Sequence, residues 1–280
     1  MAIITFCSNE MKETGQTLSL AAIATYMAIE HNYKILMVPT GFNDLTLENC
    51  FWKYNDIRPT GAFKQNAAAV GLDSGVEGLI KVINSNKTNN EIVKSYSRII
   101  LKDRLDILLS PATKMYQEYV QIAPYYSTII QTANRYYDLV FVDLSKKMPR
   151  KEIVDILQSS DLVVMNLTQR LKTIDDFMML REKSEFYRRK NIILNIGRYD
   201  KFSKYNDKNI TKYLKERKNV SVVPYNTLFF ESCSEGEIVD LLLKLRSITD
   251  ETDRNANFAK ELKKLDDNIL TKLQELQMKM

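Results

Sequence analysis

The sequence of 280 residues has few of the residues that build metal centres or disulfide frameworks. It contains one histidine, His31, and three widely separated cysteines, Cys7, Cys50 and Cys233. An odd number of scattered cysteines does not indicate a disulfide framework. A single histidine also excludes zinc sites and histidine-based catalytic triads as functions to consider. We expect His31, which lies at the end of a helix, to be hydrogen-bonded or solvated.

Long apolar runs are missing as well. No segment approaches the roughly 18 apolar residues that a membrane-spanning helix needs. The chain begins directly with a strand-like run and shows no basic-then-apolar signal sequence. The hydrophobic fraction of 45% and the charged fraction of 27% are typical of soluble globular proteins. We therefore expect a cytoplasmic protein.

Positive charge is unevenly distributed. The whole chain has a formal net charge of +5, but residues 181–218 contain 13 Lys/Arg and 5 Asp/Glu, a difference of +8. Four tyrosines lie among these basic residues. One interpretation is a nucleic-acid-binding surface that uses Arg188, Arg189 and Lys190, with affinity that falls steeply with salt. The alternative is a set of solvent-facing side chains that only keep the protein soluble.

Short apolar runs alternate with helical patterns along most of the chain. The runs are continuous and rich in Val, Ile and Leu, which is typical of strands buried on both faces of a mainly parallel sheet. The predicted strands are 3–6, 35–38, 105–109, 139–144, 162–167, 192–196 and 220–223. The predicted helices between them are 16–31, 76–84, 124–136, 151–158, 174–189, 208–217 and 235–246. This order predicts a doubly wound α/β fold over residues 1–250.

Two further segments are candidates for contact with a protein partner. Residues 251–280 contain an amphipathic helix whose apolar residues step by three or four, so it packs on its own domain or on a partner helix. Residues 40–75 form a long connection that contains Phe51, Trp52 and Tyr54. A connection of this length is uncommon unless it has a function. The aromatic residues form either a contact surface or a small satellite core.

The stretch from Ser8 to Thr17 follows an apolar run and opens a helical pattern. That strand–loop–helix context is where a phosphate-binding loop belongs, because such a loop directs backbone N–H groups at phosphates and adds a lysine. Gly15 and Thr17 fit this pattern. At the position of the lysine, however, the sequence has the neutral Gln16.

Five short sequence segments, in the same order as in the family, resemble the ParA/MinD family of P-loop ATPases. They are the loop 8–17, the Tyr137–Asp143 run (YDLVFVD), the Ser160–Thr168 run (SDLVVMNLT), the Asn191–Asn195 run (NIILN), and the Val223–Asn226 run (VPYN) with the later ESCSEG. The resemblance implies a P-loop fold, a homodimer, and ATP or ADP with Mg²⁺ as cofactors. An altered phosphate loop is similar to that of some members of the TadZ/CpaE pilus-localisation branch.

By this resemblance, the cofactor-binding residues are Lys12, Gly15, Gln16, Thr17, Asp143 and Asn195, with Thr17 and Asp143 near the metal and Asn195 near the base. The sequence departs from the family pattern at the positions that contact the nucleotide and the metal. The lysine that reaches the partner's nucleotide aligns with Met11, although Lys12 is adjacent, and Pro39 and Gly41 replace two acidic residues. Removing one electrostatic contact to a transition state typically costs about 10² to 10³ in rate. We therefore expect weak or absent nucleotide binding and no catalytic residues.

Structural roles are the alternative for the residues that remain. Thr17 would then start its helix, Asp143 would cap a helix or bind backbone N–H groups, and Asn195 would close a turn. The sequence thus favours a non-catalytic positioning or assembly scaffold in bacteria, brought to a pole or to the membrane periphery by a partner. A slow ATPase of the partition type and a DNA-binding protein remain alternatives.

Overall fold

A computed structural model describes residues 1–11, 14–53, 75–85, 89, 91–113, 115–189, 191–216, 220–248, 250, 252–253 and 255–278. Within these residues, eight strands form one sheet in the order β3-β4-β2-β5-β1-β6-β7-β8. The strands are β1 (Ala2–Ser8), β2 (Ile35–Pro39), β3 (Ser97–Leu101), β4 (Leu105–Leu108), β5 (Leu139–Asp143), β6 (Leu162–Leu167), β7 (Ile192–Tyr199) and β8 (Ser221–Pro224). The seven predicted strands are confirmed. All neighbours are parallel except β3 and β4.

The prediction missed β3. This strand lies at the edge of the sheet and is only partly buried, so it lacks the fully buried pattern by which the other strands were recognised. It follows the short helix α5 (Ile92–Tyr96) directly and returns to β4 through a turn at residues 102–104. A short antiparallel edge strand of this kind carries a weaker sequence signal than a central parallel one.

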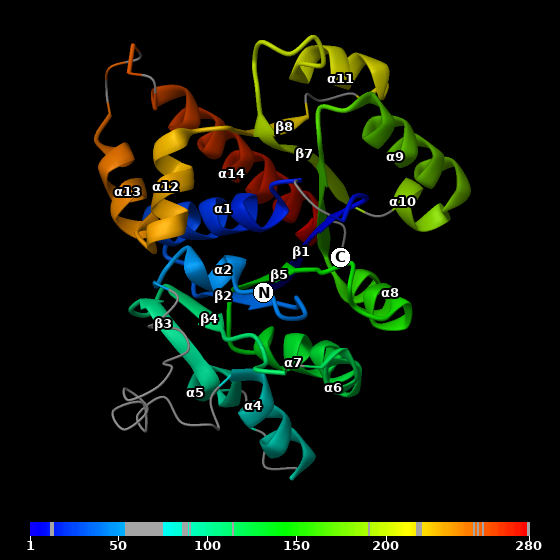
Figure 1. The fold of residues 1–280 in the computed structure, drawn as a ribbon, viewed down its shortest axis with the longest axis vertical. Coiled ribbons are helices and arrows are strands. Elements are labelled where there is room, and N and C mark those ends of the chain that lie inside the picture. The colour runs from blue at the N-terminus through cyan, green and yellow to red at the C-terminus, as the bar shows by residue number, and fades with distance from the viewer. Residues whose placement is uncertain are drawn as a thin grey trace.

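Helices cover both faces of the sheet (Figure 1). The face that carries α1 also carries α2, α12, α13 and α14, and the opposite face carries α4 to α11. Their bounds are α1 (Gln16–Glu30), α2 (Thr46–Asn49), α4 (Gly75–Asn84), α6 (Tyr116–Ile122), α7 (Tyr125–Ala133), α8 (Arg150–Ser159), α9 (Leu171–Lys183), α10 (Glu185–Arg189), α11 (Asp207–Tyr213), α12 (Thr227–Glu235), α13 (Ile238–Arg246) and α14 (Ala256–Gln277). The doubly wound α/β fold is therefore confirmed.

Side chains of each central strand alternate between two hydrophobic cores. In β1, Ile3 and Cys7 point to the core under α7 and α8, whereas Ile4 and Phe6 point to the core under α1 and α14. Successive side chains of a strand face opposite sides of a sheet, so a strand buried on both sides must be apolar throughout. This requirement explains why the sequence runs are continuous rather than alternating.

Three predicted helices differ in detail from the structure. The predicted helix 208–217 ends earlier, at Tyr213 of α11. The predicted helix 174–189 is divided at Ser184 into α9 and α10. The predicted helix 235–246 begins later, at Ile238, and is preceded by α12, which the prediction missed. Gly236 separates α12 from α13 in a left-handed conformation, φ 78°. A glycine in this conformation is a common end for a helix, since it lacks the Cβ that would be strained there.

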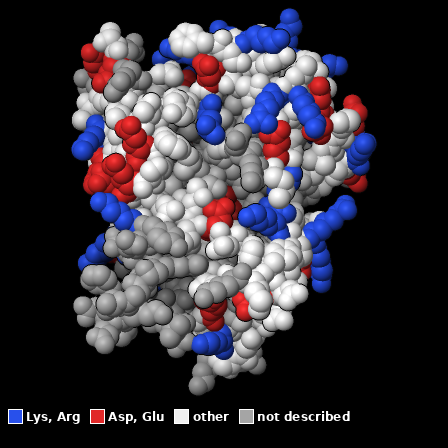
Figure 2. All heavy atoms as spheres, in the orientation of Figure 1, with Lys and Arg blue, Asp and Glu red and all other residues white. Residues whose placement is uncertain are grey.

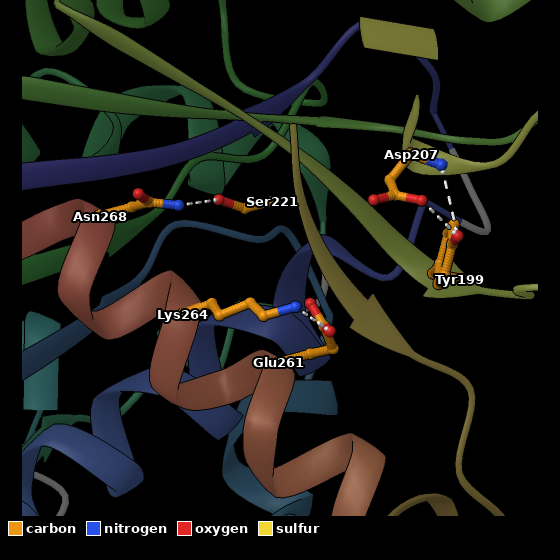
Figure 3. A network of polar contacts seen from close by, with 6 residues as sticks. All are labelled: Tyr199, Asp207, Ser221, Glu261, Lys264 and Asn268. Carbon is orange, nitrogen blue, oxygen red and sulfur yellow. Dashed lines mark hydrogen bonds and ion pairs between the residues drawn. The ribbon is translucent and has the colours of Figure 1, made fainter. Parts of the chain in front are cut away.

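The C-terminal helix α14 packs on its own domain, which was one of the two predicted outcomes. Its residues Phe258, Leu262, Leu265 and Ile269 are buried in the core beneath α1. Polar contacts surround this apolar stripe, as Figure 3 shows for the Asn268 amide, which donates to the hydroxyl of Ser221 on β8 at 3.0 Å. A protein partner at α14 would therefore have to contact its polar face.

His31 also holds α14 in place. Its Nε2 lies 2.7 Å from Oδ2 of Asp266, and the Asp266 side chain is almost fully buried. The expectation of a hydrogen-bonded histidine is thus confirmed. Burial raises the pKa of the Asp266 carboxyl, while the contact with His31 acts in the opposite direction.

The described part of the connection 40–75 belongs to the main core. Phe51 is buried and Trp52 packs against the same cluster, with the Arg98 guanidinium 4.0 Å from the centre of the Trp52 ring. These two aromatic residues therefore do not form a satellite core. Tyr54 and the rest of the segment up to residue 74 lie outside the described residues. No helix in the described part of the chain is long and apolar enough to cross a membrane.

Leu265→Ala should destabilise the protein by about 2–5 kcal/mol, because it removes a buried leucine from the contact between α14 and the domain. Urea unfolding followed by circular dichroism measures this change. Gln274→Ala, at an exposed position of the same helix, is the matched control and should change stability by less than about 0.5 kcal/mol. Equal effects of the two substitutions would mean that α14 is not docked.

Candidate functional site

The register of the sheet brings three strand ends together at its carboxyl edge. Asp143, the last residue of β5, lies opposite Phe6 of β1 on one side and Pro39 of β2 on the other. The Thr40 backbone N–H and hydroxyl both donate to the Asp143 carbonyl, at 3.1 and 2.9 Å. Ligands of open α/β sheets bind at this edge, next to a point where the strand order reverses. The site therefore lies where the fold places binding sites.

The loop after β1 reaches α1 through a tight contact with β7. Gly15 has a left-handed backbone, φ 68°, at the start of α1, and no side chain caps this helix. A Cβ at Gly197 of β7 would lie 2.3 Å from the Thr14 carbonyl oxygen and 3.0 Å from the Gly15 Cα. Both glycines are therefore required for the loop to pack against the end of β7.

The first two residues of α1 bind the carboxylate of Asp143. The Gln16 Nε2 donates to Asp143 Oδ1 at 2.6 Å and to the Leu144 carbonyl at 3.1 Å. The Thr17 hydroxyl donates to Asp143 Oδ2 at 2.8 Å. Both carboxylate oxygens thus have a partner from within the chain. Three of the predicted site residues, Gln16, Thr17 and Asp143, are brought together in this network.

Burial raises the pKa of the Asp143 carboxyl to about 6. The hydrogen bonds from Gln16 and Thr17 favour the ionised form and so oppose this increase, whereas the nearby Asp44 adds to it. Among the residues that the structure describes, no lysine or arginine belongs to the groups that set this pKa. A carboxylate held by neutral donors, without a cation, keeps the cost of its burial largely uncompensated.

A cavity of about 310 Å³ opens beside this network. Its charged lining residues in the described part of the chain are Glu10, Asp44, Asp143, Lys146 and Arg198. Three acidic groups thus face two basic ones. Pro39 and Gly41, which the sequence resemblance aligns with two acidic residues, also line it.

Several of these residues were missed by the prediction. Asp44 follows Gly41 by three positions, and its Oδ1 accepts from the N–H and the hydroxyl of Thr46 at the start of α2. Lys146 donates from its Nζ to the Asn9 carbonyl, and burial lowers its pKa. Both follow strands at the carboxyl edge, so their place in the sequence was an available signal. Arg198 gave no such signal, because it lies inside the extended β7.

Glu10 is held against α9. Its Oε1 accepts from the Thr173 hydroxyl at 2.5 Å, and the Asn9 side chain donates to the Thr173 carbonyl at 2.7 Å. These contacts fasten the loop before Gly15 to the first turn of α9. The acidic Glu10 side chain is therefore fixed at the wall of the cavity.

Asn195 lies apart from the cavity. It is fully buried within β7, and its Nδ2 donates to Asn166 Oδ1 at 2.8 Å and to the Ser19 hydroxyl at 3.3 Å. Contact with a base would require this network to open. The expected role of Asn195 as a base ligand stays a prediction.

The other predicted residues are only partly described. Lys12 and Lys190 lie outside the described residues, as does the side chain of Arg189. Arg188, on α10, is exposed. In Figure 2, Lys and Arg side chains lie along the upper edge and the right side of the face shown, with Asp and Glu among them. This view therefore shows a mixed surface rather than a uniformly basic one.

The described residues do not fit a magnesium–triphosphate complex in this arrangement. Mg²⁺ is usually bound through one or two carboxylates and the phosphates themselves. Both oxygens of Asp143 already accept hydrogen bonds from Gln16 and Thr17. The cavity of about 310 Å³ leaves space beside Gly15, so the mismatch concerns charge and donors rather than space.

Solved structures resemble the chain over almost its entire length. A ParA family ATPase from Chlorobium tepidum TLS has a TM-score of 0.65 at 20% identity, covering 93% of this chain and 95% of its own. MinD from Pyrococcus horikoshii OT3, a septum site-determining protein in complex with Mg-ADP, has a TM-score of 0.61 at 14% identity, covering 97% and 98%. The chain has the ParA/MinD fold.

A MinC:MinD cell division protein complex from Aquifex aeolicus is also similar, with a TM-score of 0.55 at 14% identity, covering 91% of this chain and 99% of that one. No protein-family model matches the sequence, and no curated protein matches it. At these identities the likeness concerns the fold, which the five sequence segments correctly predicted.

The stability of the protein should decline with rising pH relative to Asp143→Asn. The pKa of Asp143 is raised in the folded state, so its contribution is fully present below the unfolded pKa near 4 and is lost as the pH rises through about 6. Between pH 4 and pH 7, the unfolding free energy of the wild type minus that of the variant should fall by on the order of 2 kcal/mol.

Urea unfolding at a series of pH values measures this difference. The amide of the variant can accept from Gln16 and donate to the rotatable Thr17 hydroxyl, so the local contacts are kept. A difference that stays flat over this range would mean that Asp143 is ionised as easily in the fold as in the unfolded chain.

Proposed function

We propose that the chain is a ParA/MinD-like positioning or assembly scaffold in bacteria that binds nucleotide weakly or not at all and does not hydrolyse it. The observation that carries this proposal is the pair of hydrogen bonds from Gln16 to Asp143 and to the Leu144 carbonyl. A lysine at this position would place a positive charge beside the phosphates. The Gln16 amide instead donates to the Asp143 carboxylate and to the Leu144 carbonyl, so these acceptors are bound within the chain.

The charged residues that line the cavity also support weak or absent nucleotide binding. Phosphoryl transfer is catalysed almost entirely by positioning and by neutralising negative charge on the transferred group. The described cavity wall carries Glu10, Asp44 and Asp143 against Lys146 and Arg198, and Lys146 already donates to a backbone carbonyl. Such a wall offers a triphosphate little net attraction. A place in the TadZ/CpaE branch stays a prediction.

Assembly is the part of the proposal that rests on the similar proteins. One of them is solved as a MinC:MinD complex and another as a plasmid partition protein from Borrelia burgdorferi B31 bound to AMPPNP, which has a TM-score of 0.55 at 17% identity. We infer a cytoplasmic homodimer that recruits a protein partner. The polar face of α14 and the segment 40–75 are the proposed recruiting surfaces, since the apolar stripe of α14 is buried within the domain.

Calorimetry with ATP and with ADP should give small heats that Mg²⁺ does not increase, because both oxygens of Asp143 are engaged. Gln16→Lys should tighten nucleotide binding at least about tenfold, as a charge-assisted hydrogen bond is typically worth about 1.5–3 kcal/mol. Gln16→Ala is the matched control, since it removes the amide contacts and adds no charge. It should leave nucleotide binding weak.

Phosphate release separates the scaffold from a slow ATPase of the partition type. The proposal expects no release by the wild type above the background of the uncatalysed reaction. Turnover that depends on Mg²⁺ and disappears in Asp143→Ala would identify the slow ATPase instead and would end the scaffold proposal.

DNA binding is the second candidate, favoured by the exposed side chains around β7 and α11. Phe202 is 85% exposed, the Lys201 ammonium lies 5.1 Å from the centre of its ring, and Lys204 lies over Tyr205. Exposed aromatic rings beside cations suit stacked bases and a phosphate backbone. Against this, Arg181 is paired with Glu216 at 2.5 Å and is not available to phosphate.

If the basic region 181–218 binds DNA, replacing Arg188, Arg189 and Lys190 together by glutamine should weaken binding and flatten its dependence on salt. Fluorescence anisotropy with a labelled duplex at low and high salt measures both effects. The matched control replaces Lys260, Lys263 and Lys264 of α14, which removes the same charge at another place. Equal loss in both triple variants would show that only net charge acts, and no loss in either would remove this candidate.

A further inference from the structure

Two of the three cysteines meet in space although 183 positions separate them in the sequence, counted from Cys50 to Cys233. Cys50 follows α2 directly and Cys233 lies in α12, and the interaction with the Cys233 side chain raises the pKa of the Cys50 thiol. The Cys50 thiol also donates to the Thr46 carbonyl at 3.3 Å. The two thiols thus lie as neighbours in one buried hydrophobic cluster, and a disulfide requires two cysteines that are close together.

The backbones around this pair are in close contact as well. The Ile238 N–H, at the start of α13, donates to the Cys50 carbonyl at 3.3 Å. A Cβ at Gly236 would lie 2.8 to 2.9 Å from the Trp52 backbone, so only a glycine allows this approach. The turn after α2 and the end of α12 are therefore held together independently of the thiols.

We propose that Cys50 and Cys233 are an oxidation site for peroxides, at which an intramolecular disulfide fixes α2 to α12. In the first step the Cys233 thiolate attacks one oxygen of hydrogen peroxide. An S–O bond forms, the O–O bond breaks, and the leaving hydroxide takes up the proton lost by the thiol, giving water and a sulfenic acid.

In the second step the Cys50 sulfur attacks the sulfenic sulfur. An S–S bond forms, the S–O bond breaks, and the departing hydroxide takes the Cys50 proton to give a second water. Two thiols and one peroxide thus yield one disulfide and two waters, with two electrons passing from the thiols to the peroxide. This oxidation ladder ends at the disulfide because the resolving thiol is already adjacent.

The order of the two thiols follows from their surroundings. Cys233 is 5% exposed and Cys50 is 0% exposed, so Cys233 is the thiol that a small oxidant reaches first. The interaction with Cys233 and burial raise the pKa of Cys50. Cys50 therefore stays a thiol until the sulfenic acid forms. Because thiolate content and access control the rate, oxidation should be slower than that of an exposed thiol.

The disulfide would act on the wall of the cavity described above. Thr46 and Leu47 of α2 line this cavity from one side, and Phe230, one turn before Cys233 on α12, lines it from another. A covalent bridge between α2 and α12 would reduce the opening of this wall. This inference goes beyond the proposed scaffold function and does not depend on whether a nucleotide binds.

The test oxidises the full-length native protein with hydrogen peroxide, denatures it and labels the remaining thiols with N-ethylmaleimide. Mass spectrometry should show the loss of two hydrogen atoms and a single labelled cysteine, Cys7, and dithiothreitol should restore all three thiols. Cys7→Ser is the matched control and should still form the bridge. Cys50→Ser and Cys233→Ser should form no intramolecular disulfide, with circular dichroism showing that they fold.

Three labelled cysteines after native oxidation would overturn the proposal, and so would a bridge that involves Cys7 or a disulfide between two molecules. Hydrogen exchange tests the effect on the cavity wall. Residues 44–50 should exchange more slowly in the oxidised protein than in the reduced one. Unchanged exchange in a protein shown to carry the bridge would overturn the link between the thiols and the cavity.

Discussion

The carboxylate of Asp143 is the group on which the site depends, because it ends the central strand β5 and because, among the described residues, its hydrogen-bond partners are neutral donors. Register places it between β1 and β2, and Gln16 and Thr17 bind its two oxygens from the start of α1. A buried carboxylate needs hydrogen bonds or an opposite charge. Here neutral donors of the chain fill that need, so the ligand-free arrangement is satisfied without magnesium.

In this arrangement the neutral side chain of Gln16 is itself a hydrogen-bond partner of the Asp143 carboxylate. A lysine at position 16 would be drawn to phosphates, whereas an amide of similar reach donates to the nearest strong acceptors, Asp143 and the Leu144 carbonyl. A ligand that bound the Asp143 oxygens would compete with these contacts. The rest of the fold stays intact, since the glycine contact between the loop and β7 does not involve the side chain of Gln16.

The sequence predicted the fold well because burial on both faces leaves a plain signal. Continuous apolar runs located every central strand, but the half-buried edge strand β3 and the short helix α2 carried no comparable pattern. The site was predicted in part. Gln16, Thr17 and Asp143 follow from their places at strand and helix ends, whereas the contribution of Arg198 depends on how far β7 extends, which spacing alone does not reveal.

The proximity of Cys50 and Cys233 is another feature that spacing in the sequence does not predict. The sequence has three scattered cysteines, and nothing in their spacing indicated that Cys50 and Cys233 are neighbours in the fold. This proximity arises because α12 and α13 return to the face that carries α1 and α2, where Gly236 lets the chain approach Trp52. The segments that line the cavity from α2 and from α12 are therefore connected through packing rather than through their positions in the sequence.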